Sequence, residues 1–356
     1  MHAAALVEQL RRCDAGASFA GLGGDCMAQA GCTLYQDYRR MAFMGFAAVM
    51  RNWRQVKDNF RIAREALLKE QPDVLILIDY PSFNLRMAAF CRKSLPATKI
   101  YYYIPPKVWA WKRRRVHRIA RLCDGVLGIF PFEPAFYARY GYSCTYVGNP
   151  TAEEMAKITN LKSQITNHKS HIAILPGSRK NEVSHCLQRM LEAARRFPDH
   201  AITVCAAPGI EDEFYAPYLQ AGETLTRDTY GAVQSAAAAV VNSGTATLET
   251  ALLGCPQVAV YHTSFSRLVR YIRWAQPLFF SIKYFTLVNI ITGREAIKEC
   301  ISNDFTTDRV ADELGRLLYD DTHRKEVLAS YEHLRSILGS QPAAATAAAI
   351  ITSRNK

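Results

Sequence analysis

The stretch HIAILPGSRKNEV, residues 171–183, joins an apolar run to a cluster of polar and basic side chains. Its four consecutive apolar residues predict a buried strand, and the Pro-Gly pair that follows predicts the end of that strand. Ser178 then stands at the N-cap expected for a helix, and Arg179 comes next. The free N–H groups and the positive dipole end of a helix N-terminus favour an anion. This stretch alone leaves open an ordinary capped turn with solvated charges.

A second strand-to-helix turn lies in VVNSGTATLETALLG, residues 240–254. Ser243, Gly244 and Thr245 form the predicted turn, and the missing side chain at Gly244 lets a ligand approach the backbone closely. The N–H groups of the following helix suit a phosphate. Glu249 lies about one helical turn after Thr245 on the same face, where its carboxylate can accept hydrogen bonds from a ribose diol. The alternative is a capped helix with a surface glutamate.

A carboxylate follows a third apolar run, in LILIDYPSFN, residues 75–84. Asp79 stands at the predicted carboxyl end of this strand, which is where α/β sheets place their ligand-binding residues. An aspartate is ionised at neutral pH and can act as a general base. The competing interpretation is an aspartate that caps the next turn.

Aromatic and basic residues are interleaved in YYYIPPKVWAWKRRRVHRIARL, residues 101–122. Lys107 and Trp109 precede Arg113–Arg115, and the basic part of the segment is predicted to be helical. Cations beside aromatic rings suit nucleic-acid backbones and bases, so RNA binding is open on this stretch alone. No nucleic-acid-binding motif surrounds it, and we expect no nucleic-acid partner.

Large apolar residues gather in MGFAAVMRNWRQV, residues 44–56, namely Phe46, Val49, Met50 and Trp53. Their helical spacing gives an apolar stripe. One interpretation is that this stripe belongs to the hydrophobic core. The other is a surface that enters a bilayer or holds acyl chains, with nearby cations for phosphate groups.

The composition is that of a globular protein of two domains, with 356 residues of which 49% are apolar. No run of 18 apolar residues predicts a membrane-spanning helix, and the first residues do not show the pattern of a signal peptide. Ten cysteines without a CxxC pair indicate free thiols in a reducing cytosol rather than a structural zinc site. The net charge of +12 favours anionic partners.

Short strands alternate with helices along the chain, as in a doubly wound α/β fold. The strands are rich in Val, Ile and Tyr and mostly lack polar alternation, which indicates parallel strands covered on both faces. We predict helices at residues 51–70 and 182–196, and strands at residues 74–80, 100–104, 126–130, 145–147, 172–175, 202–206, 238–242 and 258–261.

Turn-forming residues at 148–154 precede a polar stretch, so we place a domain boundary there. This gives a Rossmann-like N-terminal domain at residues 1–150, a Rossmann-like C-terminal domain at residues 151–335 and a helical tail at residues 336–356. We expect ligands at the strand ends that face a cleft between the two domains. The chain opens on an amphipathic helix where such a domain normally opens on a strand, so we expect the first sheet to lack one strand.

Taken together, these motifs resemble the lipid-A-disaccharide synthase family, whose members are glycosyltransferases of the GT-B architecture. The resemblance runs from the first helix to at least Glu299 and rests on IDYPSFN, PPKVWAWKRRRVHRI, FPFEPAFY, YVGNP, ILPGSRKNEV, NSGTATLE and VNIITGRE in this order. It implies an inverting hexosyltransferase that joins UDP-2,3-diacylglucosamine to 2,3-diacylglucosamine 1-phosphate, forming the β-1,6 disaccharide of lipid A and UDP. It also implies a cytoplasmic protein, peripheral on the inner face of a Gram-negative inner membrane, and suggests a homodimer with exchanged carboxyl-terminal segments.

The resemblance implies a role for each candidate residue. Asp79 is the base that deprotonates the 6-hydroxyl of the acceptor, and Arg179 neutralises the departing diphosphate. We expect no metal or other cofactor, because the chemistry needs no DxD-type carboxylate pair and the sequence has none. The remaining substrate-binding residues are Ser178, Ser243, Gly244, Thr245, Glu249, Asn289, Lys107 and Trp109.

Two features depart from the pattern of the family. The family opens with a strand and a GExSGD loop that this sequence lacks, and Pro105 stands where the family usually has serine. We expect the chain to be less stable and less active than a version with that strand. Two alternatives stay open: another UDP-N-acetylglucosamine enzyme of this architecture, such as the peptidoglycan glycosyltransferase or the 2-epimerase, and a non-catalytic nucleotide- or RNA-binding protein.

Overall fold

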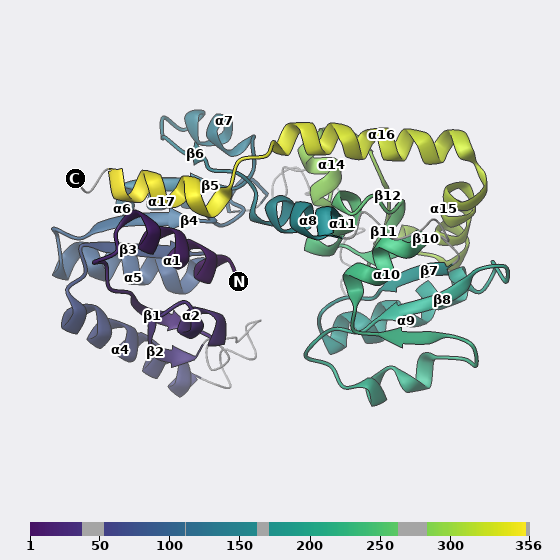
Figure 1. The fold of residues 1–356 in the computed structure, drawn as a ribbon, viewed down its shortest axis with the longest axis horizontal. Coiled ribbons are helices and arrows are strands. Elements are labelled where there is room, and N and C mark those ends of the chain that lie inside the picture. The colour runs from purple at the N-terminus through teal and green to yellow at the C-terminus, as the bar shows by residue number, and fades with distance from the viewer. Residues whose placement is uncertain (38–52, 111, 162–170, 263–282, 354–356) are drawn as a thin grey trace. The chain divides into compact units, whose positions relative to one another are not determined.

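The computed structural model describes residues 1–37, 53–110, 112–161, 171–262 and 283–353 (Figure 1). It divides the chain into two compact units. Unit 1 comprises residues 1–150 and 340–356, and unit 2 comprises residues 151–339. Both units contain parallel sheets with helices packed on them, so the predicted α/β class is confirmed.

Unit 2 contains one six-stranded parallel sheet in the order β12-β11-β10-β7-β8-β9. The first strand of the sheet, β7, lies in its middle. The next two strands are added on one side of it, and the chain then crosses over and builds the other side, as in a doubly wound fold. The crossover makes β7 and β10 neighbours, so the switch point of the sheet lies between them. The strands are β7 (His171–Leu175), β8 (Ala201–Cys205), β9 (Thr224–Thr226), β10 (Ala236–Asn242), β11 (Gln257–Tyr261) and β12 (Lys298–Ile301).

Helices cover this sheet because their apolar residues face it. In α9, seven residues at helical spacing are buried, and the exposed residues are all polar or charged. The helices of unit 2 are α8 (Pro150–Leu161), α9 (Lys180–Ala194), α10 (Thr229–Ser235), α11 (Thr245–Leu252), α14 (Leu287–Thr292), α15 (Thr307–Tyr319) and α16 (Asp321–Leu338).

The described strands of unit 1 form two separate parallel sheets. One pairs β1 (Ala20–Gly23) with β2 (Thr33–Asp37), and the other has the order β3-β4-β5-β6. The second sheet consists of β3 (Val74–Ile78), β4 (Lys99–Tyr103), β5 (Gly125–Gly128) and β6 (Thr145–Tyr146).

Both faces of the four-stranded sheet are buried, as the alternation in β4 shows. Ile100 and Tyr102 pack in one apolar cluster with residues of α5 (Pro81–Ser94), α6 (Arg115–Leu122) and α7 (Glu133–Ala138). Tyr101 and Tyr103 pack in a second cluster with residues of α1 (His2–Cys13) and α17 (Ala343–Ser353). The period of two in a strand therefore places the tyrosines of YYY alternately on opposite faces.

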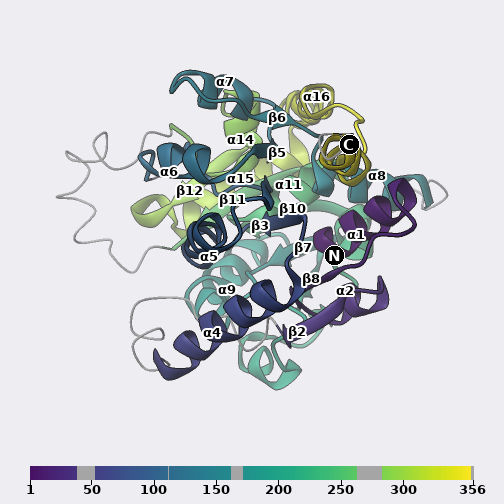
Figure 2. The same cartoon turned by 90° about the vertical axis from the view of Figure 1, so that its left-hand side faces the viewer.

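The first and last helices lie side by side in unit 1, although they come from opposite ends of the sequence (Figure 1). The remaining helices are α2 (Asp25–Gln29) and α4 (Trp53–Glu70), and α4 packs on β1, β2 and α5 (Figure 2). No helix within the described ranges carries an apolar stretch long enough to cross a bilayer.

All eight predicted strands are present, with ends that differ from the prediction by at most two residues. Four others, β1, β2, β9 and β12, were not predicted. The first helix buries its predicted apolar residues, Ala4, Leu6, Val7 and Leu10. The basic segment is helical only from Arg115 onward.

Candidate functional site

The two predicted strand-to-helix turns of unit 2 meet at the switch point of its sheet. Leu175 at the end of β7 pairs in register with Val241 of β10, so the turns that follow these strands are neighbours. Gly177 lies in the left-handed region with φ of 121°, and a Cβ there would stand 2.7 Å from Nδ2 of Asn242. The close approach of the two turns therefore requires glycine at this position. Doubly wound sheets bind their ligands at such a switch point.

Arg179, and not Ser178, is the N-cap of α9. The prediction that Ser178 caps the helix is wrong because Glu182 reaches back from the first turn and occupies the helix start. Its Oε2 accepts a hydrogen bond from the backbone N–H of Ser178 at 3.0 Å, and its Oε1 accepts one from Nη1 of Arg179 at 2.5 Å. A carboxylate thus already uses the groups that the sequence assigned to an external anion. The Arg179 side chain remains 55% exposed.

The turn after β10 is open to a ligand at its backbone. Ser243 donates its N–H to the carbonyl of Val260 at 2.7 Å, which fixes the turn on the sheet. Gly244 is the N-cap of α11 in an extended conformation, and a Cβ there would meet only one backbone oxygen, at 4.0 Å. Gly244 and Thr245 are exposed, so the start of α11 presents its backbone at the surface.

Glu249 is half-buried on α11, and its carboxylate forms no hydrogen bond or ion pair with any residue of the described ranges. Burial raises the pKa of its carboxyl, and the nearby carboxylate of Glu154 raises it further. Burial raises the pKa of Tyr230 to about 12, and the negative charge of the nearby Glu249 contributes to this shift. A desolvated carboxylate without a partner is a strong acceptor for hydroxyl donors.

Asn289 lies in α14 and is fully buried. Its Oδ1 accepts hydrogen bonds from the backbone N–H groups of Ala296 and Ile297, at 2.8 and 3.0 Å. Its Nδ2 donates to the carbonyl of Ile297 and to Oε1 of Glu299, both at 2.9 Å. Every polar atom of this amide is therefore used inside the protein, where it holds the segment between α14 and β12.

Asp79 ends β3 in unit 1 with a strained backbone. Asp79 and Tyr80 both adopt left-handed conformations, with φ of 46° and 40°, which cost about 1–3 kcal/mol each for residues other than glycine. The strain is held by hydrogen bonds to the Asp79 carbonyl, which accepts from Tyr102 Oη at 2.7 Å and from Asn84 Nδ2 at 2.6 Å. Sequence analysis did not single out these two positioning residues, although Asn84 lies in the quoted IDYPSFN motif.

The carboxylate of Asp79 is available for chemistry. Asp79 is exposed, and its carboxylate makes no hydrogen bond or ion pair with a described residue. Tyr80 is the N-cap of α5 and no side chain caps that helix, so Asp79 does not have the capping role of the competing interpretation. Strained residues over-determined by their surroundings cluster at functional sites.

A buried carboxylate, that of Glu133, accepts a hydrogen bond from the segment that contains Lys107 and Trp109. Glu133 is fully buried, and its Oε2 accepts the backbone N–H groups of Ile129 and Phe130 at 2.8 and 3.0 Å. Its Oε1 accepts from Nε1 of Trp109 at 3.3 Å. Trp109 itself is only 6% exposed and packs edge-on against Phe130 and Phe132. Sequence analysis missed Glu133, which stands in the quoted motif FPFEPAFY.

The charges of this motif lie near Asp79. Desolvation lowers the pKa of the Lys107 ammonium, while the carboxylates of Asp79 and Glu133 oppose this shift. Burial raises the pKa of Glu133 to about 7, against three hydrogen bonds and Lys107, which lower it. Lys107 is exposed as a residue but its ammonium group is desolvated, and it lies close enough to Asp79 for that carboxylate to favour its charged form.

The proposed membrane stripe falls largely outside the described residues. Phe46, Val49 and Met50 lie in that part of the chain. Trp53 is the first residue of α4, and only its backbone is described. The two interpretations of this stripe, core and membrane surface, therefore stay as predictions.

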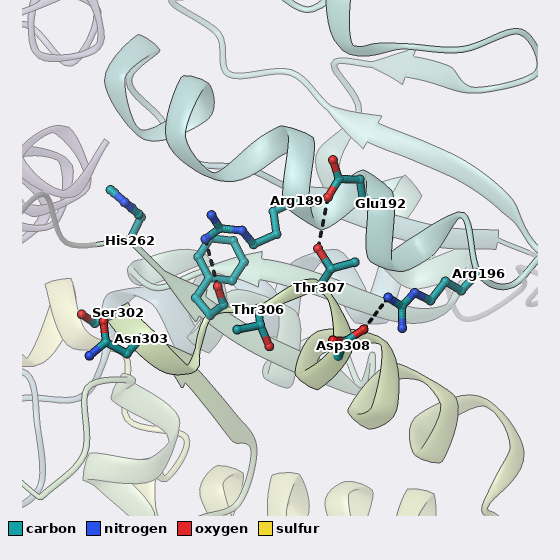
Figure 3. Close-up of a pocket in the computed structure, with 10 residues that line it drawn as sticks. Arg189, Glu192, Arg196, His262, Ser302, Asn303, Thr306, Thr307 and Asp308 are labelled. Carbon is teal, nitrogen blue, oxygen red and sulfur yellow. Dashed lines mark hydrogen bonds and ion pairs between the residues drawn. The ribbon is translucent and has the colours of Figure 1, made fainter. Parts of the chain in front are cut away.

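A further pocket of about 790 Å³ lies between α9 and the residues that follow β12 (Figure 3). Its charged side chains largely satisfy each other. Arg196 pairs with Asp308 at 2.5 Å, and Nη1 of Arg189 donates to the carbonyl of Phe305 at 2.9 Å. The pocket contains none of the residues that the sequence predicted for nucleotide binding, and we assign no function to it.

The parallel sheets and the strand order of unit 2 define a fold class, the GT-B fold. The calicheamicin glycosyltransferase CalG4 matches 99% of this chain and 94% of its own, with a TM-score of 0.61 and 13% identity. A UDP-GlcNAc 2-epimerase from Neisseria meningitidis matches 98% of this chain and 94% of its own, with a TM-score of 0.59 and 12% identity. At such low identity these similarities show the fold.

The particular family follows from closer relatives. The family model described as lipid-A-disaccharide synthetase matches residues 1–351, so this chain belongs to that family. The lipid-A-disaccharide synthase of Trichlorobacter lovleyi is 34% identical over 95% of this chain and 90% of its own. That of Myxococcus xanthus is 35% identical over 98% of this chain and 92% of its own. The family resemblance is confirmed, and the chain is a glycosyltransferase, so the alternatives from other classes are not favoured.

Proposed function

We propose that this chain transfers the diacylglucosamine of UDP-2,3-diacylglucosamine to 2,3-diacylglucosamine 1-phosphate, with inversion. The observation that carries the mechanism is the exposed, strained Asp79 at the end of β3, whose carboxylate has no partner among the described residues. A base in this state can accept a proton without first breaking an interaction of its own.

The reaction needs one base and a stabilised leaving group. Asp79 takes the proton of the acceptor 6-hydroxyl as its oxygen bonds to the anomeric carbon of the donor. The bond from that carbon to the β-phosphate oxygen breaks, its electron pair stays on the phosphate, and UDP departs. The attack from the opposite face inverts the configuration, as in inverting glycosidases.

Unit 2 supplies the groups for UDP in this proposal. Negative charge grows on the diphosphate in the transition state, and Arg179 with the starts of α9 and α11 offsets it. The hydroxyls of Ser178 and Ser243 and the backbone of Gly244 and Thr245 provide the surrounding donors, and Glu249 accepts from the ribose hydroxyls. Binding of the diphosphate requires Arg179 to leave Glu182, its partner in this structure.

Two further features belong to the proposal. Because both substrates carry acyl chains, the reaction would take place at the cytoplasmic face of the inner membrane. The apolar stripe from Phe46 to Trp53 would contact lipid, and Lys107 would lie near a substrate phosphate. The family resemblance also favours a homodimer, which light scattering on the purified protein tests.

The experiment is product analysis with purified protein and the two diacyl substrates. Mass spectrometry should detect the tetra-acyl disaccharide 1-phosphate with one UDP released per product, and proton NMR should show the β configuration at the new bond. A protein that releases no disaccharide but converts UDP-N-acetylglucosamine to its 2-epimer would contradict the proposal.

A further inference from the structure

A second pocket in unit 1 is rich in cations. It has a volume of about 410 Å³, within the range of roughly 300–1,000 Å³ typical of small-molecule sites. Four of its six lining residues are Lys or Arg and none is acidic. The lining residues are Val56, Lys57, Phe60, Arg61 and Arg64 from α4 and Arg86 from α5.

The spacing along α4 explains the arrangement. Lys57, Arg61 and Arg64 are four and three residues apart and therefore share one face of the helix. Phe60, on the same side, stacks on Phe83 of α5 with ring centroids 4.7 Å apart. Phe83 is buried with apolar residues of both helices, so the pocket has a fixed aromatic floor beneath a rim of cations.

Two of these cations, Arg64 and Arg86, form no ion pair with a described residue. The guanidinium of Arg86 lies 5.3 Å from the ring centre of Phe60, and that of Arg64 lies 5.1 Å from the ring centre of Phe90. Such contacts orient a guanidinium without neutralising it. Arg61, by contrast, is paired with Glu65 at 3.1 Å.

The pocket is connected to the proposed base by α5. This helix starts at Pro81, two residues after Asp79, and Arg86 lies about 8 Å further along its axis. The ring of Tyr80 lies 5.9 Å from that of Phe83, which forms the floor with Phe60. A ligand that extends from Asp79 to Arg86 would therefore run along the first turns of α5.

From this geometry we infer that the α4–α5 pocket binds the phosphomonoester of the lipid acceptor, with Arg64 and Arg86 as its ligands. The inference rests on the proposed function, in which the acceptor carries a 1-phosphate and presents its 6-hydroxyl to Asp79. Planar guanidinium groups bind phosphate oxygens in pairs, which suits a doubly charged phosphomonoester. The Phe60 face offers an apolar surface to the sugar ring.

The test compares two double variants that lose the same charge from the same helices. Arg64→Gln with Arg86→Gln removes the pocket cations, and Lys69→Gln with Lys93→Gln removes two exposed cations that do not line it. Disaccharide formation is measured in mixed micelles with acceptors that carry or lack the 1-phosphate. We expect the KM for the phosphorylated acceptor to rise about tenfold or more in the pocket variant alone. The KM for the donor and turnover of the acceptor without phosphate should stay at wild-type values.

Other outcomes overturn the inference. An unchanged KM, or an equal rise in the control variant, would show that the pocket does not recognise the phosphate. Lost binding to phosphatidylglycerol vesicles with an unchanged KM would assign the pocket to membrane headgroups instead.

Calorimetry with glucosamine 1-phosphate and with glucosamine separates this inference from the proposed function. Binding of the phosphorylated sugar alone, abolished in the pocket variant at an unchanged melting temperature, supports the pocket even if the wild-type protein makes no disaccharide. Equal binding by the wild type and the pocket variant contradicts it, whatever the activity.

Discussion

Arg179 is held by a carboxylate of its own helix, and this pairing shapes what its removal should do. Because Arg179 must exchange Glu182 for the diphosphate, only the difference between the two pairings contributes to binding. We expect Arg179→Ala to weaken UDP binding about 10- to 100-fold, the effect of losing a hydrogen bond to a charged group. Calorimetry with UDP measures this.

Arg196→Ala is the control, because it removes a cation from the residues just after the same helix. This variant should bind UDP normally. Equal affinity in the wild type and both variants would place the diphosphate elsewhere.

Glu249 combines a cost in stability with a proposed role in binding. Because burial raises its pKa, the ionised carboxylate is less favourable in the folded than in the unfolded chain at neutral pH. Glu249→Gln should therefore raise the melting temperature at pH 7 and yet weaken UDP binding, since a carboxylate accepts more strongly than an amide.

The pH dependence provides a second measurement on Glu249. As the pH falls through the raised pKa, protonation removes the acceptor, so UDP affinity should fall more steeply in the wild type than in Glu249→Gln. The variant also corrects for titration of UDP itself. Parallel pH profiles for the two proteins would remove Glu249 from the ribose site.

At single positions, the sequence predicted the turns and strand ends better than the side-chain contacts around them. The turns at 178 and 243–245 and the end of β3 were placed correctly because strand ends and glycine turns have local signals. Ser178 was misassigned as a cap because Glu182, one turn later, competes for the same groups. Glu133 was missed because a charged residue is expected at the surface, and only the assembled loops show the three donors that it accepts.

Among the elements, the loops before α6 and α7 are tied together by the buried Glu133. Glu133→Gln keeps one oxygen for the two backbone donors but turns an amide toward the N–H of Trp109. We expect Glu133→Gln to lower the free energy of unfolding. In a Trp109→Phe background, where that N–H is absent, the loss should be smaller by at least about 0.5 kcal/mol. A double-mutant cycle from urea unfolding measures this coupling; additive effects would contradict the contact.

Glu133 should also make stability depend on pH. With a pKa of about 7 in the folded state against about 4.5 in the unfolded state, the folded chain holds the extra proton between these values. The contribution of this group to the free energy of unfolding therefore falls as the pH rises from about 4.5 to 7. Glu133→Gln should lose this component of the pH profile.

The elements that sequence analysis missed are those with weak local signals. Most of the eight predicted strands are apolar runs buried in the sheets, whereas β1 is AGLG, β9 has three residues and β12 begins with Lys and Glu. Such segments become strands because a neighbouring strand pairs with them, and this depends on contacts distant in sequence. The division of the described strands of unit 1 into two sheets was not predicted.

At the scale of the whole molecule, the two ends of the described chain share one core. Ile351 of α17 is 2% exposed and packs with Leu6 of α1 and the tyrosines of β4. Ile351→Ala should lower the free energy of unfolding by about 2–5 kcal/mol. Ile350→Ala, at a partly buried neighbouring position, should cost less.

The effect of Ile351→Ala should also be confined to unit 1. Hydrogen exchange should speed up in β4 and α1 and stay unchanged in β10 of unit 2, because the two units have separate cores. Faster exchange in both units alike would show that they unfold as one.

Unit 1 is proposed to abstract the proton and unit 2 to bind the nucleotide, and turnover of Asp79→Asn tests that division most directly. The substitution keeps the shape of the side chain and removes its basicity. We predict that the rate of disaccharide formation falls by about 10²–10⁴ while the Kd for UDP stays within error of the wild type. Near-normal turnover in this variant would contradict the account, because the proton of the acceptor would then be taken by another group.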